Sequence, residues 1–168
     1  NPNAGKSTLM NAFLSQKLSI ITAKAQTTRH RILGIFNTPE AQVVFSDTPG
    51  IIKPEYALQE RMMDATNSTF EDADIMLLVI AADDDGDLDK NAWKRITNFG
   101  GRLLIVMNKI DLSKQKDLEQ LADVWQKKLP DAEIWSISAT KSFRVMELRD
   151  RIVSLIPNHP PFFPKDQI

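Results

Sequence analysis

The sequence contains no cysteine among its 168 residues. Disulfides and thiolate metal sites are therefore excluded, and the absence is typical of proteins that work in a reducing cytoplasm. Long apolar runs are missing as well, because the run from Ile75 to Ala82 is far shorter than the ~20 residues of a membrane-spanning helix. The first residues show no signal-peptide pattern. These absences predict a cytoplasmic protein without a transmembrane segment.

An excess of charge of one sign is missing too. Lys and Arg number 21 against 22 Asp and Glu, which leaves a net charge of −1. A surface without an overall positive field does not attract nucleic acid by itself, so RNA binding would need a local patch or a separate module. With 42% hydrophobic and 26% charged residues, the chain has the composition of a soluble globular protein of one compact domain.

Apolar runs alternate with amphipathic stretches along the chain. We expect strands at Arg31 to Phe36, Gln42 to Ser46, Ile75 to Ala81, Leu103 to Met107 and Glu133 to Ile137. We expect helices at Lys6 to Ser15, Leu58 to Phe70, Asp89 to Asn98, Lys116 to Leu129 and Ser142 to Ile156. Repeated βαβ units predict the α/β class, a three-layer α/β/α sandwich around a mostly parallel sheet. The last three strands are predicted to lie in the sheet interior, since the runs beginning at Ile75 and Leu103 lack polar alternation.

The chain opens on a phosphate-binding signature. Its first residues match the P-loop pattern G-x-x-x-x-G-K-[ST] from the second position onward, and they are Asn1, Pro2, Asn3, Ala4, Gly5, Lys6, Ser7 and Thr8. Only the first glycine of the pattern is missing. In a P-loop NTPase fold a buried strand feeds this loop, so we expect that the first β-strand is missing here and that the intact protein begins earlier.

Each residue type in this loop has a physical task. Gly5 lets the backbone turn tightly against a phosphate, and successive amides of residues 3–7 form an anion-binding nest at a helix N-terminus. Lys6 supplies positive charge to the β- and γ-phosphates, and the Ser7 hydroxyl is a hard oxygen ligand for Mg²⁺. Standing alone, G-K-S would indicate only an ordinary helix start after a glycine turn. The motifs further along the chain favour nucleotide binding.

A second motif, D-T-P-G, spans residues 47–50 and follows an apolar stretch. Asp47 would hold Mg²⁺ through water, and the Gly50 amide would contact the γ-phosphate. The tetrapeptide alone is weak evidence, because it also forms plain turns, but its spacing after the P-loop strengthens it. The polar segment between the two motifs is predicted to be a mobile loop, in which we favour Thr28 over Thr27 as a further Mg²⁺ ligand.

A third motif predicts that the base is guanine. Asn108, Lys109 and Asp111 follow the expected strand that ends at Met107. The Asp111 carboxylate can accept from both the ring N–H and the exocyclic amine of guanine, a donor pair that adenine lacks. Asn108 would brace the loop, and the Lys109 stem would cover the flat face of the purine. A triplet after the final strand completes the predicted pocket, in which an Ala139 amide can donate to guanine O6: Ser138, Ala139 and Thr140.

Two further segments carry a resemblance to a known family. The run K-A-Q-T-T-R-H-R spans residues 24–31, and P-P-F-F-P-K-D-Q spans residues 160–167. With the order of the nucleotide motifs, they resemble the Era family of translation-factor-related GTPases over essentially the whole chain. The resemblance implies a G domain over residues 1–156 and a linker over residues 157–168 that leads to an absent KH RNA-binding domain. It also implies that the intact protein binds 16S rRNA, assists assembly of the small ribosomal subunit and associates peripherally with the membrane.

The catalytic residues expected from the motifs are Lys6, Thr28, Asp47 and Gly50. Ras-like enzymes orient the attacking water with a glutamine just after the D-x-x-G glycine, where this chain has Ile51. An aliphatic side chain cannot orient water, so we predict slow basal hydrolysis and stimulation by a partner. Related GTPases without the glutamine bind K⁺ beside the phosphates, which suggests a K⁺ ligand at Asn3. The alternative is that Asn3 hydrogen-bonds the mobile loop or the P-loop.

Other interpretations share part of this evidence. A tRNA-modification GTPase or the cytosolic domain of an iron transporter has the same nucleotide motifs. A binding module that senses GTP with only incidental hydrolysis would also have them. Asp111 argues against an ATP-using enzyme. The acidic run of residues 83–87 could suggest a Ca²⁺ site, but a solvated loop is expected instead, because its spacing lacks the bidentate glutamate of an EF-hand.

Overall fold

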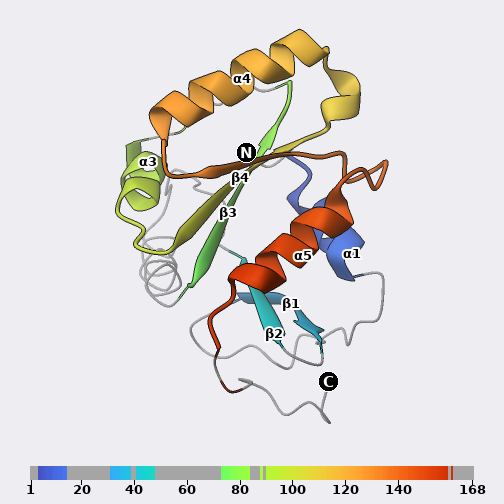
Figure 1. Cartoon of the computed structure of the whole chain (residues 1–168), viewed down its shortest axis with the longest axis vertical. Helices are drawn as coiled ribbons and strands as arrows, with labels where there is room; N and C mark the ends of the chain where they lie inside the picture. The colour runs from blue at the N-terminus through green and yellow to red at the C-terminus, as the bar shows by residue number, and fades with distance from the viewer. Residues whose placement is uncertain are drawn as a thin grey trace, which may run out of the picture. The chain divides into compact units, whose positions relative to one another are not determined.

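The computed structural model describes residues 4–14, 31–38, 41–47, 73–83, 88, 90–158 and 160 (Figure 1). The chain divides into two compact units. The first contains the described residues of 4–13, 74–83 and 100–155, and the remaining described residues belong to the second. The expected helix over 58–70 and the polar segment over 22–30 lie outside the described residues.

A parallel sheet forms the centre of the first unit. Its strands are β3 (Ile75–Ala81), β4 (Arg102–Asn108) and β5 (Glu133–Ser136), in the order β3-β4-β5. The register pairs Leu78 with Ile105 and Ile105 with Ile134. The predicted α/β class with a parallel sheet is confirmed.

Of the three strands expected in the sheet interior, only β4 lies between two strands within the described part of the chain, whereas β3 and β5 each pair on one side there. All four residues of β5 are half-buried, whereas β4 is buried from Leu104 to Asn108. The reason is visible in the composition of β5, because Glu133 begins it and a partly exposed position tolerates that charge. The apolar run of β4 from Leu103 to Met107 is typical of a strand covered on both faces.

Helices lie on both sides of this sheet. α4 (Gln115–Lys128) lies on one side, and α1 (Lys6–Leu14) and α5 (Val145–Leu155) lie on the other (Figure 1). A short 3₁₀ helix, η2 (Ile110–Leu112), follows β4 directly. The buried side chains of α1, α4 and α5 recur every three to four residues, as expected of helices that pack one face on a sheet: Leu9, Phe13, Leu118, Trp125, Val145, Leu148 and Ile152.

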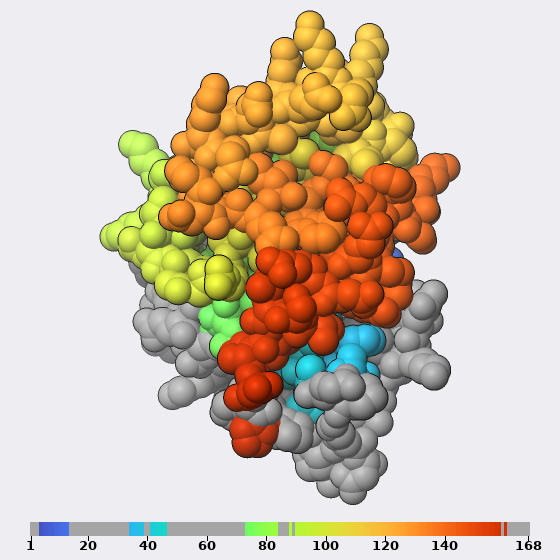
Figure 2. All heavy atoms as spheres, in the orientation of Figure 1, coloured from blue at the N-terminus to red at the C-terminus, as the bar shows by residue number. Residues whose placement is uncertain are grey.

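The last helix begins later than its apolar pattern predicted. We expected it from Ser142, but α5 starts at Val145, because Ser142 and Arg144 both have φ of 54°. A residue in this left-handed region cannot belong to a right-handed helix. The chain between β5 and α5 is instead a tight turn, and in Figure 2 the orange segment that contains this turn lies between α4 and α5.

The second unit contains a two-stranded antiparallel ribbon. Strands β1 (Arg31–Asn37) and β2 (Gln42–Asp47) pair in register from Arg31 opposite Asp47, with an irregularity between Ile32 and Gly34. Thr38 closes the connection, because its amide donates to Ala41 O at 2.7 Å. Helix α3 (Lys90–Thr97) belongs to the same unit and buries Ala92 and Ile96, which lie one turn apart.

None of the described helices is both long and apolar enough to cross a membrane. The bounds of the other described strands and helices agree with the sequence prediction to within one residue at each end, which is within the usual fraying of element ends.

Candidate functional site

The N-terminal part of the site is a glycine turn that opens α1. Gly5 has φ of 82°, and its carbonyl accepts from the Leu9 amide at 2.9 Å, which is the first hydrogen bond of the helix. Ala4 is buried before it, and Leu9 and Phe13 are fully buried after it. The turn is therefore anchored on both sides, so that the N-terminal end of α1 faces one fixed direction.

Asn108 approaches this turn closely. A Cβ atom built on Gly5 would lie 2.3 Å from Asn108 Nδ2, far inside van der Waals contact. Position 5 therefore needs glycine for two independent reasons: its left-handed backbone and the absence of room for a side chain. The sequence pattern indicated the first reason, but only the packing reveals the second.

Asn108 links three segments that are distant in sequence. Its Nδ2 donates to Ala4 O at 2.9 Å, and its Oδ1 accepts from the Ala139 amide at 2.9 Å. The side chain is only 2% exposed, so both bonds are sheltered from water. The Asn108 backbone carbonyl accepts from the Ala82 amide at 2.8 Å. One buried amide therefore ties the end of β4 to the phosphate-loop turn and to the turn after β5.

The polar groups of the α1 N-terminus remain accessible. Ser7 and Thr8 are exposed, and Lys6 is half-buried. An exposed hydroxyl in the first turn of a helix is suited to bind a hard cation such as Mg²⁺ next to phosphate oxygens. The described residues contain no cluster of three or more His, Asp or Glu side chains that would hold a metal without such help.

Asp111 lies at the other end of the site, where the backbone reverses after β4. Lys109 adopts a left-handed conformation with φ of 63°, and this bend starts η2. The Ser138 hydroxyl donates to Asp111 Oδ1 at 2.5 Å, a charge-assisted bond that fixes one carboxylate oxygen. Asp111 is nevertheless exposed, whereas Ser138 is only 1% exposed. A ligand can therefore reach a carboxylate that a buried hydroxyl holds in place.

The residues from Ser138 to Phe143 form a closed turn, called here the 138–143 turn. Ser138 and Phe143 exchange two backbone hydrogen bonds of 3.2 and 3.0 Å. The Lys141 amide also donates to Ser138 Oγ at 3.3 Å, and Thr140 Oγ1 lies 3.4 Å from the same oxygen. The Ala139 amide donates to Asn108 Oδ1. Donation to guanine O6 would require the amide to share its proton between two acceptors, so this predicted contact with the base stays a prediction.

The structure brings most of the described sequence candidates into one unit. The residues that it brings together are Ala4, Gly5, Lys6, Ser7, Thr8, Asn108, Lys109, Asp111, Ser138, Ala139 and Thr140. Asp47 ends β2 in the second unit and is not placed beside them. Asn1, Pro2, Asn3, Thr28, Gly50 and Ile51 lie outside the described residues.

Two residues at this site escaped the sequence analysis. Phe143 closes the 138–143 turn through its backbone, although its side chain is 51% exposed. Arg144 follows it in a left-handed conformation and packs its guanidinium over the Trp135 ring. The sequence contains no signal for either role, because Ser142 and Arg144 stand at positions where a glycine would have marked a turn.

Comparison with known proteins supports the interpretation of these motifs. Residues 1–109 match the family model described as 50S ribosome-binding GTPase. The chain is 40% identical over 168 residues to GTPase Era of Lacticaseibacillus paracasei, covering 99% of this chain and 56% of that protein. It is 36% identical over 167 residues to GTPase Era of a Thermoanaerobacter species, with 99% and 55% coverage. The chain thus spans about half the length of these curated relatives.

Solved structures give the same result for the fold. A crystal structure of Era with MgGDPNP and nucleotides 1506–1542 of 16S ribosomal RNA superposes with a TM-score of 0.74 at 38% identity, covering 98% of this chain and 57% of that one. An Aquifex aeolicus Era variant bound to GDP and AlF₄⁻ gives 0.75 at the same identity and coverage. Elongation factor SelB of Methanococcus maripaludis, at 18% identity and 0.66, shares the fold.

Proposed function

Because the chain belongs to the family of 50S ribosome-binding GTPases, we propose that it binds GTP and GDP and hydrolyses GTP. The observation that carries the proposal is the Asn108 side chain. Its two hydrogen bonds, to Ala4 O and from the Ala139 amide, hold the three predicted nucleotide motifs of the first unit together. Motif residues that share no structural site would not be joined by one buried amide.

Guanine would be read by Asp111. Ser138 holds one carboxylate oxygen at 2.5 Å, and the exposed carboxylate would accept from the ring N–H and the exocyclic amine of guanine. The aliphatic stem of Lys109 would cover one face of the base. Adenine presents an acceptor instead of the ring N–H, so an ATP complex would leave the carboxylate facing a lone pair.

The phosphates would lie at the α1 N-terminus. The amides after Gly5 and the Lys6 ammonium would balance the charge on the β- and γ-phosphates, including the charge that develops as water attacks in line. Ser7 fits a role as Mg²⁺ ligand, since its hydroxyl is exposed in the first helical turn, and Asp47 and Thr28 would join it. When bound, Mg²⁺ supplies further charge neutralisation at the phosphates.

Hydrolysis is proposed to be slow until a partner binds. Ile51 stands directly after the D-x-x-G motif, and its aliphatic side chain cannot orient the attacking water. The orienting group would then be a backbone group, a residue of the 22–30 segment or a partner. A GTP-sensing module with negligible hydrolysis would have the same site, and turnover with and without small ribosomal subunits separates the two.

Potassium dependence is proposed for the same step, with Asn3 as the K⁺ ligand. The cation would supply a further positive charge beside the phosphates. Hydrolysis should be faster in K⁺ than in Na⁺, and Asn3→Ala should remove the difference. Equal rates in the two salts for the parent chain would exclude the idea.

The activity proposed for the intact protein is assembly of the small ribosomal subunit. The solved Era structure contains 16S ribosomal RNA, and this chain aligns with about half of that protein. We propose that residues 157–168 form a linker to a KH domain that binds this RNA, and that the protein is cytoplasmic with peripheral membrane association. A KH signature beyond residue 168 would support this role, and a transmembrane run there would support the iron-transport alternative. Finding neither would reopen the question, with a tRNA-modification role among the alternatives.

The test of the proposed function is nucleotide binding by the full chain. Isothermal titration calorimetry with Mg²⁺ present should give tight binding of GDP and no measurable binding of ADP. Phosphate release from GTP should then be slow, and added small ribosomal subunits should increase it. Equal affinity for GDP and ADP would overturn the guanine assignment, whereas binding without any turnover under either condition would support the sensing module.

A further inference from the structure

The 138–143 turn leads into a residue whose backbone conformation is unfavourable. Arg144 has φ of 54°, in the left-handed region that glycine adopts without cost and other residues avoid. Ser142 has the same φ. Two such residues within three positions indicate that the surrounding contacts impose the conformation.

Arg144 makes contacts that can impose it. Its guanidinium carbon lies 4.8 Å from the centroid of the Trp135 ring, and its Nε donates to Glu147 Oε2 at 3.1 Å. The first contact reaches back to β5, and the second reaches forward to the first turn of α5. Arg144 therefore bridges the two elements that flank the turn.

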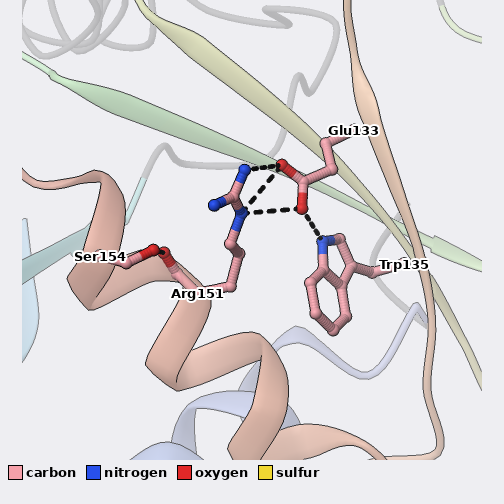
Figure 3. A network of polar contacts seen from close by, with 4 residues as sticks. All are labelled: Glu133, Trp135, Arg151 and Ser154. Atoms are coloured by element: carbon pink, nitrogen blue, oxygen red, sulfur yellow. Dashed lines mark hydrogen bonds and ion pairs between the residues drawn. The ribbon is translucent and has the colours of Figure 1, made fainter.

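The Trp135 ring is itself held in place. Its Nε1 donates to Glu133 Oε1 at 2.9 Å, and Arg151 of α5 donates to the two oxygens of the same carboxylate from Nε and Nη2 at 3.0–3.2 Å (Figure 3). Figure 3 shows the Glu133 carboxylate between the Arg151 guanidinium and the Trp135 ring. A ring fixed by a charged acceptor offers Arg144 a preorganised surface.

We infer that Arg144 is a positioning residue for guanine recognition: its contact with Trp135 latches the 138–143 turn and so holds the Ser138 hydroxyl on Asp111. The inference rests on the proposed function, in which Asp111 reads the base. Arg144 is adjacent to Phe143, whose backbone exchanges two hydrogen bonds with Ser138. The contact of Arg144 with Trp135 therefore acts one residue away from the Ser138–Phe143 backbone pair that holds the Ser138 hydroxyl in place.

Loss of the latch affects one part of guanine recognition most. With Ser138 less firmly placed, the Asp111 carboxylate loses the bond that sets its orientation. A rotating carboxylate still meets the ring N–H, but it no longer presents its second oxygen to the exocyclic amine. The preference for guanine over hypoxanthine, which lacks that amine, then falls.

The experiment measures the affinities of the full chain for GDP and for inosine diphosphate by calorimetry. Arg144→Gly removes the latch and leaves a backbone that adopts φ of 54° readily. We expect it to lower the ratio of the two affinities roughly fivefold, the scale of one lost cation–π contact. Trp135→Leu should do the same, and the double variant should lower the ratio no further. Arg144→Lys, which keeps the charge and loses the planar stack, should give an intermediate ratio.

Ser142→Gly is the matched control, because it changes a residue with the same φ and an exposed side chain. Its affinity ratio should equal that of the parent. A parent preference for GDP that Arg144→Gly leaves unchanged would overturn the latch while the proposed function stands. A parent that binds both nucleotides equally would overturn guanine recognition and the latch together. Thermal melts of each variant confirm that the ratios refer to folded protein.

Discussion

The two ends of the candidate site are built in different ways. At the phosphate end, recognition would come from backbone amides and the Lys6 charge, and the hydroxyls of Ser7 and Thr8 are exposed. At the base end, buried side chains carry the geometry: Asn108 is 2% and Ser138 1% exposed, and each makes hydrogen bonds to other segments. The phosphate end relies on one helix start, whereas the base end is assembled from several segments.

This difference shows where each end is vulnerable. A backbone nest tolerates many side chains but not a change of backbone conformation, so its sensitive position is Gly5. A side-chain network tolerates few substitutions at its centre, because a lost partner leaves a buried polar group without a hydrogen bond. Asn108 belongs to both ends, since it touches Ala4 and Ala139.

The largest effect is expected for Gly5→Ala. The new Cβ would lie 2.3 Å from Asn108 Nδ2 at a φ of 82°, so that both the turn and the Asn108 side chain must shift. We expect GDP affinity to fall by about 100-fold or more and the free energy of unfolding to drop by about 2 kcal/mol or more. Calorimetry and urea unfolding measure these changes.

Gly100→Ala is the matched control for this substitution. A Cβ at Gly100 meets nothing within 4 Å. The variant should bind GDP as the parent does and should be as stable or slightly more stable. Equal behaviour of the two alanine variants would show that the phosphate end does not depend on the backbone of Gly5.

A smaller loss is expected for Asn108→Ala, which removes the bonds to both ends at once. The variant leaves Ala4 O and the Ala139 amide without their hydrogen-bond partner, so the free energy of unfolding should fall by about 1–3 kcal/mol. GDP affinity should fall roughly 10- to 100-fold, which corresponds to about 1.4–2.8 kcal/mol of binding free energy. Asn98→Ala, at an exposed position after α3, should change neither quantity. An Asn108→Ala variant with the GDP affinity and stability of the parent would contradict the conclusion that Asn108 supports both ends of the site.

Ser142→Gly should change stability in the opposite direction. A φ of 54° destabilises a serine by on the order of 1 kcal/mol of conformational free energy, whereas glycine adopts it without strain. The Ser142 side chain is exposed, so its removal leaves no cavity. We expect a higher free energy of unfolding by up to about 1 kcal/mol, measured by urea denaturation. Ser154→Gly, inside α5, should lower it by a similar amount. If Ser142→Gly and Ser154→Gly lower the free energy of unfolding by the same amount, the backbone of Ser142 is not strained.

The smallest effect concerns Glu133, at the edge of the base end. Its hydrogen bond from Arg151 lowers the pKa of the Glu133 carboxyl below the ordinary value of 4.5. The ionised form therefore stabilises the fold above pH 4.5, and this contribution is lost as the pH falls through the lowered pKa.

Glu133→Gln should accordingly be slightly less stable than the parent at pH 7. The difference should shrink once the pH falls below 4.5 and vanish below the folded-state pKa. Urea unfolding at a series of pH values measures it, and high salt should reduce it because the pair is half-exposed. A difference that is constant with pH would mean that the lost interaction is not ionic.

Local chemistry explains why so much of the site was predictable. The alternation of apolar and amphipathic runs predicted the parallel sheet, and the polar motifs directly after β4 and β5 predicted one base pocket. The two strands are parallel, so that these motifs follow the same edge of the sheet. The start of α5 was not predictable, since Val145 to Leu155 and the preceding turn have similar apolar spacing. Only the φ values of Ser142 and Arg144 separate them.

The sequence by itself determined the residue types and their order: the glycine and lysine of the phosphate turn, and the carboxylate at Asp111. These are local patterns, because turn formation and donor or acceptor identity belong to single residues. The tertiary structure alone decided that Asn108 occupies the space a Gly5 side chain would need, and that Arg144 packs on Trp135. Such contacts depend on distances between segments far apart in the chain, and no local pattern encodes those distances.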